Sequence, residues 1–118
     1  MAIEADRISI VQGEDVAITV KVIDASDVAV DIDGYTLKAS VRIEREGQIE
    51  IITKATGGSG IAITDAPGGV YVITISSADT KKLRVPAVYF WDTWRVDEGQ
   101  LAQLAYGELE VLGSAVQP

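Results

Sequence analysis

The chain contains no cysteine and no histidine. Without cysteine it can form neither disulfides nor thiolate metal sites. Without histidine it lacks the commonest metal ligand and the side chain that titrates near neutral pH. A Ser-His-Asp or Cys-His catalytic arrangement therefore cannot be assembled from this chain alone. We expect a protein that is not an enzyme and that binds no cofactor.

Long apolar runs and an excess of positive charge are also missing. No run approaches the ~20 apolar residues that span a bilayer. The first residues carry acid, at Glu4 and Asp6, where a signal peptide would carry base. Lys and Arg number 10 against 18 Asp and Glu, so the net charge is −8. Because this charge disfavours contact with phosphate backbones and anionic lipids, we expect neither nucleic acid nor a membrane as partner.

What the chain does contain is a series of strand-length segments rich in Val, Ile and Thr. Turns with Gly, Asp and Pro separate these segments by about 8–12 residues, which is typical of a β-sandwich. A length of 118 residues suits one domain with its own core. The sequence predicts a single all-β domain over residues 1–118, with tails at about 1–6 and 113–118. We expect a two-sheet, immunoglobulin-like sandwich of about seven or eight strands.

Alternation of apolar and polar residues predicts which faces of the strands are buried. Val16 to Ile23 alternates clearly, and Thr36 to Glu44 does so strictly. In the second of these segments the expected core residues are Leu37, Ala39, Val41 and Ile43. A hairpin turn at 45–48 is expected to lead into a further strand from Ile49 to Lys54.

Other segments are less regular. Val28 to Ile32 is short and apolar, which predicts an edge strand or a connection. One short helical turn is expected near 77–83, capped by Ser77 and unable to continue past Pro86. Gly107 lies inside the last predicted strand, 101–112, and predicts a bulge or a close backbone approach there.

The most distinctive segment runs from Tyr89 to Val96 and holds both tryptophans and the only phenylalanine. In a strand its side chains alternate between faces, so Trp91 and Trp94 point in opposite directions unless a bulge resets the alternation. One Trp is then outside the core, and the sequence leaves open which one. Such a residue suits a protein interface, packing between strands without a partner, or a platform for carbohydrate. The candidate partner-binding residues are Trp91, Trp94, Tyr89 and Arg95.

Acidic residues offer two weaker hypotheses. Four aspartates, at Asp24, Asp27, Asp31 and Asp33, resemble an oxygen-rich calcium loop, although no Glu follows at EF-hand spacing. The alternative is that they form turns and are solvated, and we expect no metal. Carboxylate pairs such as Glu108 with Glu110 could in principle hydrolyse glycosides, but they read more simply as the polar face of a strand.

Three stretches together carry a family resemblance: Val30–Leu37 (VDIDGYTL), Tyr89–Asp97 (YFWDTWRVD) and Leu104–Val111 (LAYGELEV). From about Gly13 to Leu112 the chain resembles small virion proteins of tailed bacteriophages and prophages, and in particular the N-terminal domain of phage baseplate upper proteins. The resemblance implies an immunoglobulin-like sandwich that mounts one virion component on another and has no catalytic residues. Baseplate upper proteins usually continue into further domains, whereas this chain stops at Pro118. We therefore expect an adaptor, a plug or a decoration.

The function expected from the sequence is that of a non-catalytic structural or adaptor protein in the tail, baseplate or neck of a phage. Its expected partners are other virion proteins, with homo-oligomers in the assembled particle. Its expected location is the virion, after assembly in the host cytoplasm. Two alternatives stay open: a capsid decoration protein, and a small carbohydrate-binding module.

Overall fold

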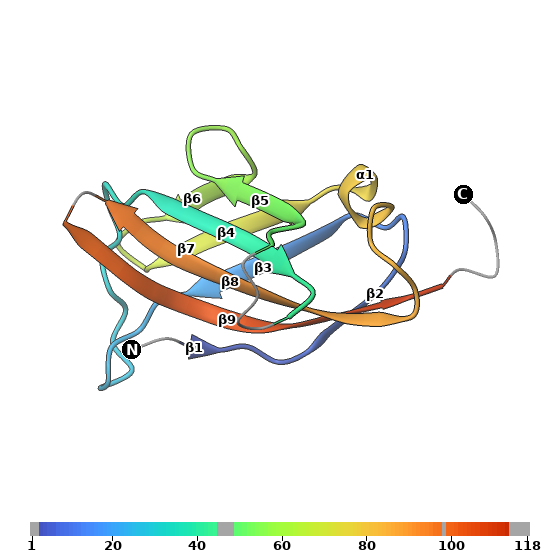
Figure 1. Ribbon diagram of the computed structural model, residues 1–118. Coiled ribbons are helices and arrows are strands. Elements are labelled where there is room, and N and C mark those ends of the chain that lie inside the picture. The colour runs from blue at the N-terminus through green and yellow to red at the C-terminus, as the bar shows by residue number, and fades with distance from the viewer. Residues whose placement is uncertain (1–2, 45–48, 98, 114–118) are drawn as a thin grey trace.

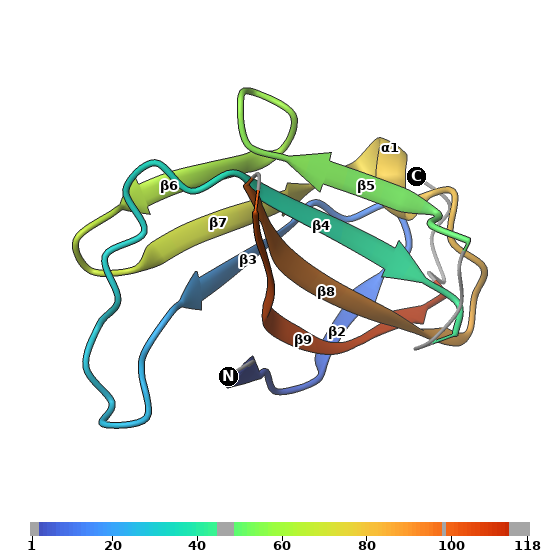
Figure 2. The ribbon, with the colours of Figure 1, turned by 60° about the vertical axis from the view of Figure 1, so that its left-hand side comes forward.

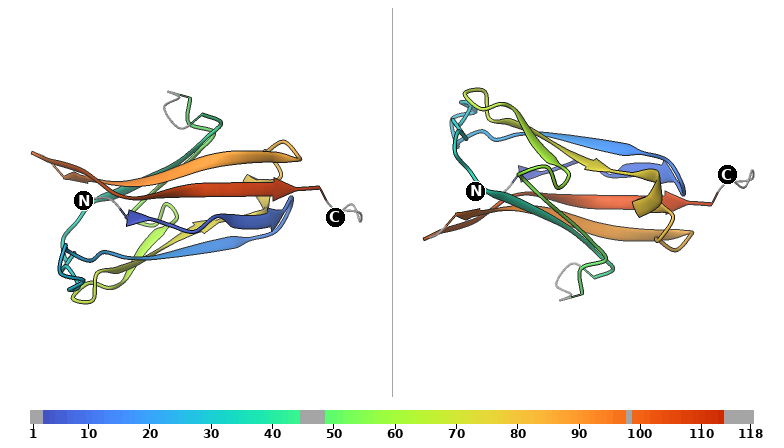
Figure 3. Two further views of the ribbon diagram at one scale, coloured as in Figure 1. Left: turned by 90° about the horizontal axis from the view of Figure 1, so that it is seen from below. Right: turned by 90° about the horizontal axis from the view of Figure 1, so that it is seen from above.

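The computed structural model describes residues 3–44, 49–97 and 99–113, and it is an all-β sandwich, as the sequence predicts (Figure 1). Two sheets form separate layers, which are seen edge-on in Figure 3. The larger sheet has the order β1-β9-β8-β4-β5, with β2 also beside β9, and the smaller has the order β3-β7-β6. The strands are β1 (Ile3–Glu4), β2 (Ile8–Val11), β3 (Val16–Lys21), β4 (Leu37–Arg42), β5 (Ile52–Ala55), β6 (Ile61–Asp65), β7 (Val70–Ile75), β8 (Ala87–Asp97) and β9 (Gln100–Leu112).

The strand order is that of an immunoglobulin-like sandwich. The larger sheet combines the last two strands, β8 and β9, with β4 and β5, while β3, β7 and β6 form the opposite layer. Most neighbouring strands run antiparallel, but β1 and β2 run parallel to β9, so the beginning and the end of the chain share one edge. Chain segments about a hundred residues apart are thereby joined, with Ile8 opposite Leu109.

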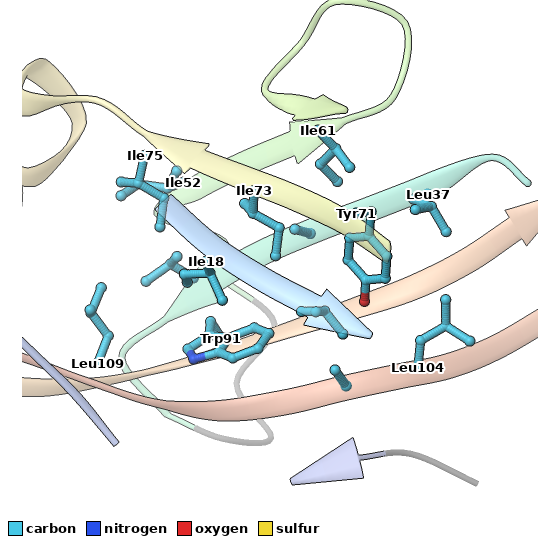
Figure 4. Packing of buried hydrophobic residues seen from close by; sticks show 14 of the residues in the cluster. Ile18, Leu37, Ile52, Ile61, Tyr71, Ile73, Ile75, Trp91, Leu104 and Leu109 are labelled. Carbon is cyan, nitrogen blue, oxygen red and sulfur yellow. The ribbon is translucent and has the colours of Figure 1, made fainter. Parts of the chain in front are cut away.

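The core lies between the layers because alternate residues of each strand face inward. Ile18 of β3, Ile73 of β7, Val41 of β4 and Leu109 of β9 are all buried, and their exposed neighbours point to solvent. Figure 4 shows Ile18, Ile73 and Leu109 in the space between the sheets, with the hydroxyl of Tyr71 directed toward the larger sheet. This hydroxyl lies 2.5 Å from Thr93 Oγ1 of β8, so the buried polar groups satisfy each other.

Helix α1 (Ser77–Thr80) is the predicted helical turn, but its capping residue is Ser76, one position earlier than expected. Ser76 accepts a hydrogen bond from the Asp79 backbone N–H, and the Asp79 carboxylate accepts one from the Ser76 backbone N–H. This capping box starts the helix where the chain leaves β7 for β8. In the described ranges no helix is long and apolar enough to cross a bilayer.

Of the two structures expected for Val28 to Ile32, an edge strand or a connection, the connection is the one found: the segment forms no strand, makes one isolated bridge, between Ala29 and Ile23, and buries Ile32. Other expectations need correction. Ile43 was expected in the core but lies beyond the end of β4 with 57% exposure. Ile49 is 79% exposed, since β5 begins only at Ile52. Residues 3–4, expected as tail, form β1. The predicted hairpin turn at 45–48 and most of the C-terminal tail lie outside the described residues.

Candidate functional site on the larger sheet

The aromatic segment forms β8, in the middle of the larger sheet, and keeps a strict alternation of faces. Its register with β4 is unbroken, from Leu37 opposite Arg95 to Arg42 opposite Phe90. A register shift does occur on the other side of β8, between Thr93 and Trp94, but there the extra residue, Leu104, belongs to β9. The alternation along β8 therefore decides which Trp is outside: Trp91 faces the core and Trp94 the outer face.

Trp91 is 3% exposed and packs between the sheets, near Ile18 (Figure 4). Its indole lies directly over Gly107 of β9, where a Cβ atom would come within 2.8 Å of Trp91 Nε1. The sequence predicts a bulge or a close backbone approach at Gly107. The structure shows a close approach there, but it is made by the Trp91 side chain. Trp91 Nε1 is buried and has no hydrogen-bond partner within the described part of the chain. Its place in the core leaves Trp91 unable to offer its ring to a partner.

Tyr89 is likewise 3% exposed, and its hydroxyl ties β8 to the preceding connection. The hydroxyl accepts a hydrogen bond from the Arg84 backbone N–H at 2.5 Å and lies 3.4 Å from the Arg84 carbonyl. This is the tyrosine corner that immunoglobulin-like sandwiches place near the start of the corresponding strand. Tyr89 thus has a structural role and does not belong to a partner surface.

The Arg95 side chain contacts other residues of its own chain, at the end of the sandwich where β8 and β9 meet. Its guanidinium stacks 3.8 Å from the centre of the Tyr35 ring, and its Nε donates to Asp97 at 2.8 Å. The hydrogen bonds from Arg95 and from the Thr36 backbone lower the pKa of the Asp97 carboxyl. Of the four residues expected to bind a partner, only Trp94 reaches the outer face of the larger sheet.

On that outer face the side chains gather around Asp92. Its Oδ1 accepts a hydrogen bond from Ser40 Oγ at 2.9 Å, and its Oδ2 accepts one from Trp94 Nε1 at 3.1 Å. Gln103 Nε2 is 3.5 Å from Oδ2, and the guanidinium of Arg42 is 3.6 Å away. Three strands, β4, β8 and β9, thus hold one carboxylate, which fixes the orientation of the outward Trp. We call this surface the Asp92 face; it comprises Ser40, Arg42, Phe90, Asp92, Trp94, Gln103 and Tyr106.

Glu50 extends the polar network of this face toward β5. It accepts hydrogen bonds from Arg42 at 3.1 Å, Lys38 at 3.3 Å and Thr53 at 3.1 Å. Burial by itself would raise the pKa of the Glu50 carboxyl, but these three hydrogen bonds outweigh it and lower the pKa. Arg42 therefore bridges two carboxylates, Glu50 and Asp92, and is held in one orientation.

The Asp92 face is hollowed. A depression of about 270 Å³ lies over the centre of the sheet, and a second of about 240 Å³ lies toward β5. Arg42 borders both depressions, and its Nε is buried without a hydrogen-bond partner among the described residues. The first depression is lined by Arg42, Phe90, Trp91, Asp92, Gln103, Tyr106 and Gly107. Aromatic rings beside a preorganised cation and carboxylate are side chains that can bind a partner.

The four aspartates considered as calcium ligands are all exposed and belong to the connection between β3 and β4. Asp24 Oδ1 accepts hydrogen bonds from the backbone N–H of Ser26 and of Val28, and Asp31 Oδ1 accepts one from Asp33. These are turns closed by their own side chains. Within ranges 3–44, 49–97 and 99–113 no three acidic side chains converge to hold a metal ion. Asp27 has a positive φ of 60°, as turn residues of its type tolerate.

The sequence interpretation missed most of the Asp92 face. Phe90 and Asp92 share a strand face with Trp94, so the alternation along β8 could have singled them out. Arg42 and Ser40 come from β4, and Tyr106 and Gln103 from β9, and no sequence signal fixes the register that brings them together. Comparison with protein-family models and with curated proteins finds no match for this chain.

Proposed function

We propose that this chain is a non-catalytic structural or adaptor protein of a bacteriophage virion, in its tail, baseplate or neck, that binds other virion proteins through the Asp92 face. The location rests on the resemblance of its sequence to baseplate upper proteins. The mode of action rests on the surface itself, an aromatic and arginine-containing patch on a sheet rather than on a loop.

The observation that carries the proposal is the fixed orientation of Trp94. Its Nε1 hydrogen bond to Asp92 holds the ring on a rigid central strand, so little conformational entropy is lost when a partner packs on it. Trp, Tyr and Arg supply most of the binding energy in protein interfaces, and here Arg42 and Tyr106 lie on the same face. The sheet edges and the acidic loops offer no comparable cluster in the described residues.

Incorporation into particles tests this role. Phage particles assembled with Trp94→Ala should contain much less of this protein than wild-type particles, while the purified variant keeps its fold. Thr74→Ala serves as the control, since Thr74 is exposed on the smaller sheet. Equal incorporation of Trp94→Ala and wild type would contradict a role for the Asp92 face in assembly.

Location within the particle requires a separate measurement. Quantitative proteomics of purified heads and purified tails should find the protein in tails, at few copies per particle. Many copies in heads would instead favour a capsid decoration protein, the first alternative. Its absence from both fractions would argue against a virion role altogether.

One observation favours the second alternative, a carbohydrate-binding module. The depression over the sheet combines aromatic rings with Asp92, Gln103 and Arg42, and sugars are bound by stacking on aromatic rings together with hydrogen bonds to such side chains. Binding on a glycan array that is abolished by Trp94→Ala or Asp92→Ala would support this alternative. No binding to any glycan would leave the protein-interface proposal as the better one.

A further inference from the structure

Most of the sheet edges in the described residues carry a feature that discourages pairing with another chain. β5 points Lys54 inward, where its Nζ pairs with Asp79 at 2.6 Å. β6 has a register shift between Ile63 and Asp65. β1 and β2 are two and four residues long and are separated by a break in pairing. Inward charges, bulges and short strands are the usual protection of edges.

β3 has none of these features. It is six residues long, contains no proline, and pairs with β7 in one unbroken register from Val16 opposite Ile75 to Lys21 opposite Val70. It is the outermost strand of the smaller sheet, beyond β7 (Figure 2). Its only charged residue, Lys21, is the last one.

The pairing also shows which backbone groups face the open edge. The Val22 N–H donates to the Gly69 carbonyl at 2.8 Å, on the β7 side. Backbone groups alternate sides along a strand, so those of Ile18 and Val20 are also directed at β7. The backbone groups of Ala17, Thr19 and Lys21 therefore point away from β7, toward the open edge of the sheet. The side chains of these three residues are exposed on the outer surface of the sandwich.

We propose that β3 pairs antiparallel with β3 of a second copy of this chain, about a two-fold axis through Ile18. This register places the apolar inward residues opposite each other, Ile18 against Ile18 and Val16 against Val20 of the second copy. On the outer surface it places Asp15, the residue before β3, opposite Lys21 of the second copy. The symmetry repeats this pair, so two opposite-charge pairs flank the contact.

Charge complementarity decides between the two registers that are centred on the middle of β3 and keep inward residues opposite inward ones. With the axis through Thr19, Lys21 would lie opposite Ala17 and Asp15 opposite the apolar Ile23, so both charges would lose their partner. The register about Ile18 also sets Ala17 opposite Thr19, a pair that exchanges two backbone hydrogen bonds. The two smaller sheets become one six-stranded sheet, and the Asp92 face, on the other layer, stays accessible.

Sedimentation across a concentration series tests the contact. The wild-type chain should shift from monomer to dimer. Thr19→Pro removes the N–H that faces the open edge and should raise the dimer dissociation constant about tenfold or more. Thr19→Val, which keeps both that N–H and the shape of the side chain, should dimerise like wild type. A wild-type chain that stays monomeric, or a Thr19→Pro variant that is folded and dimerises normally, would overturn the proposal.

Cross-linking tests the register of the two β3 strands without a proline substitution. Because the chain has no cysteine, single introduced cysteines report only their own contacts. A mixture of Ala17→Cys and Thr19→Cys should form a disulfide-linked heterodimer on mild oxidation, while neither variant alone should be linked efficiently. Linked homodimers of Thr19→Cys would place the axis at Thr19 and overturn the register, and no linkage in any sample would overturn the pairing.

Discussion

Gly107 and Trp91 are opposite each other on neighbouring strands, and the missing side chain of one makes room for the ring of the other. An added Cβ at position 107 would lie 2.8 Å from Nε1 and 3.0 Å from Cε2 of Trp91. The ring is packed on its other side by the core and cannot retreat freely. A single glycine in the last strand thus fixes the position of the largest side chain in the core.

Gly107→Ala should therefore lower the free energy of unfolding by about 1–3 kcal/mol, because it overpacks this contact. The measurement is chemical denaturation of the variant beside wild type. In a Trp91→Leu background the same substitution should cost clearly less, since the smaller side chain leaves room for the methyl group. Equal costs in the two backgrounds would mean that the ring does not determine the need for glycine.

The two tryptophans should respond differently to truncation. Trp91→Ala removes a buried ring and should cost about 3–5 kcal/mol in the free energy of unfolding. Trp94→Ala removes a ring on the outer face and should cost less than about 1 kcal/mol. Chemical denaturation of both variants provides the comparison, and similar losses would contradict the assignment of their faces.

Tyr71 gives a pH-dependent prediction. Burial raises the pKa of its hydroxyl to about 12, although the hydrogen bond with Thr93 opposes the shift. Below pH 10 the hydroxyl is protonated in both the folded and the unfolded chain, so its contribution to stability is complete there. Above this pH the unfolded chain releases the proton first, and stability is lost as the pH rises toward about 12. Relative to Tyr71→Phe, the wild type should lose about 2–3 kcal/mol across this window in urea titrations.

At the level of the elements, α1 joins the two sheets. It follows β7 of the smaller sheet, and its Asp79 forms an ion pair with Lys54 of β5 in the larger sheet. The same carboxylate closes the capping box with Ser76. One side chain therefore starts the helix and connects the layers, and both partners of the ion pair are mostly buried.

Asp79→Asn should lower the free energy of unfolding by about 2 kcal/mol, because it leaves Lys54 without its counter-charge. Burial would raise the pKa of the Asp79 carboxyl, but hydrogen bonds from Lys54 and Ser76 outweigh it and lower the pKa. The wild-type advantage should accordingly be complete above the ordinary carboxyl pKa and disappear as the pH falls through the lowered one. Denaturation of both proteins from neutral to acid pH measures this, with Asp33→Asn as an exposed control.

Sequence patterns predict the elements unevenly, for physical reasons. β3, β4 and β8 alternate regularly because one face is buried, and the faces of β8 follow from that alternation alone. Val28 to Ile32 is equally apolar, but its backbone hydrogen bonds go to neighbouring loops, and periodicity cannot reveal that. The Asp92 face is the harder case, because it depends on the register of β4 and β9 against β8, which is a tertiary property.

At the scale of the whole molecule, the two sheets expose surfaces that we assign to two different contacts. The larger sheet presents the Asp92 face with its aromatic and charged residues, while the smaller sheet presents the open edge of β3. Because these lie on opposite layers, a substitution at one should not change binding at the other. Trp94→Ala should therefore leave the sedimentation behaviour unchanged. Single copies of the Thr19→Pro variant should still be incorporated into phage particles. A loss of dimerisation in Trp94→Ala would show that the two surfaces are coupled.

The parallel pairing of β2 with β9 bears on how the domain withstands mechanical load. Tension applied between the two ends of the chain would pull these strands in opposite directions along their length. The hydrogen bonds between them, from Ile8 opposite Leu109 to Val11 opposite Leu112, would then resist together in shear instead of opening one after another. Stretching single molecules by force spectroscopy should reveal a high rupture force. Gln12→Pro, which deletes the backbone N–H that donates to the Leu112 carbonyl at 2.9 Å just after β2, should reduce that force.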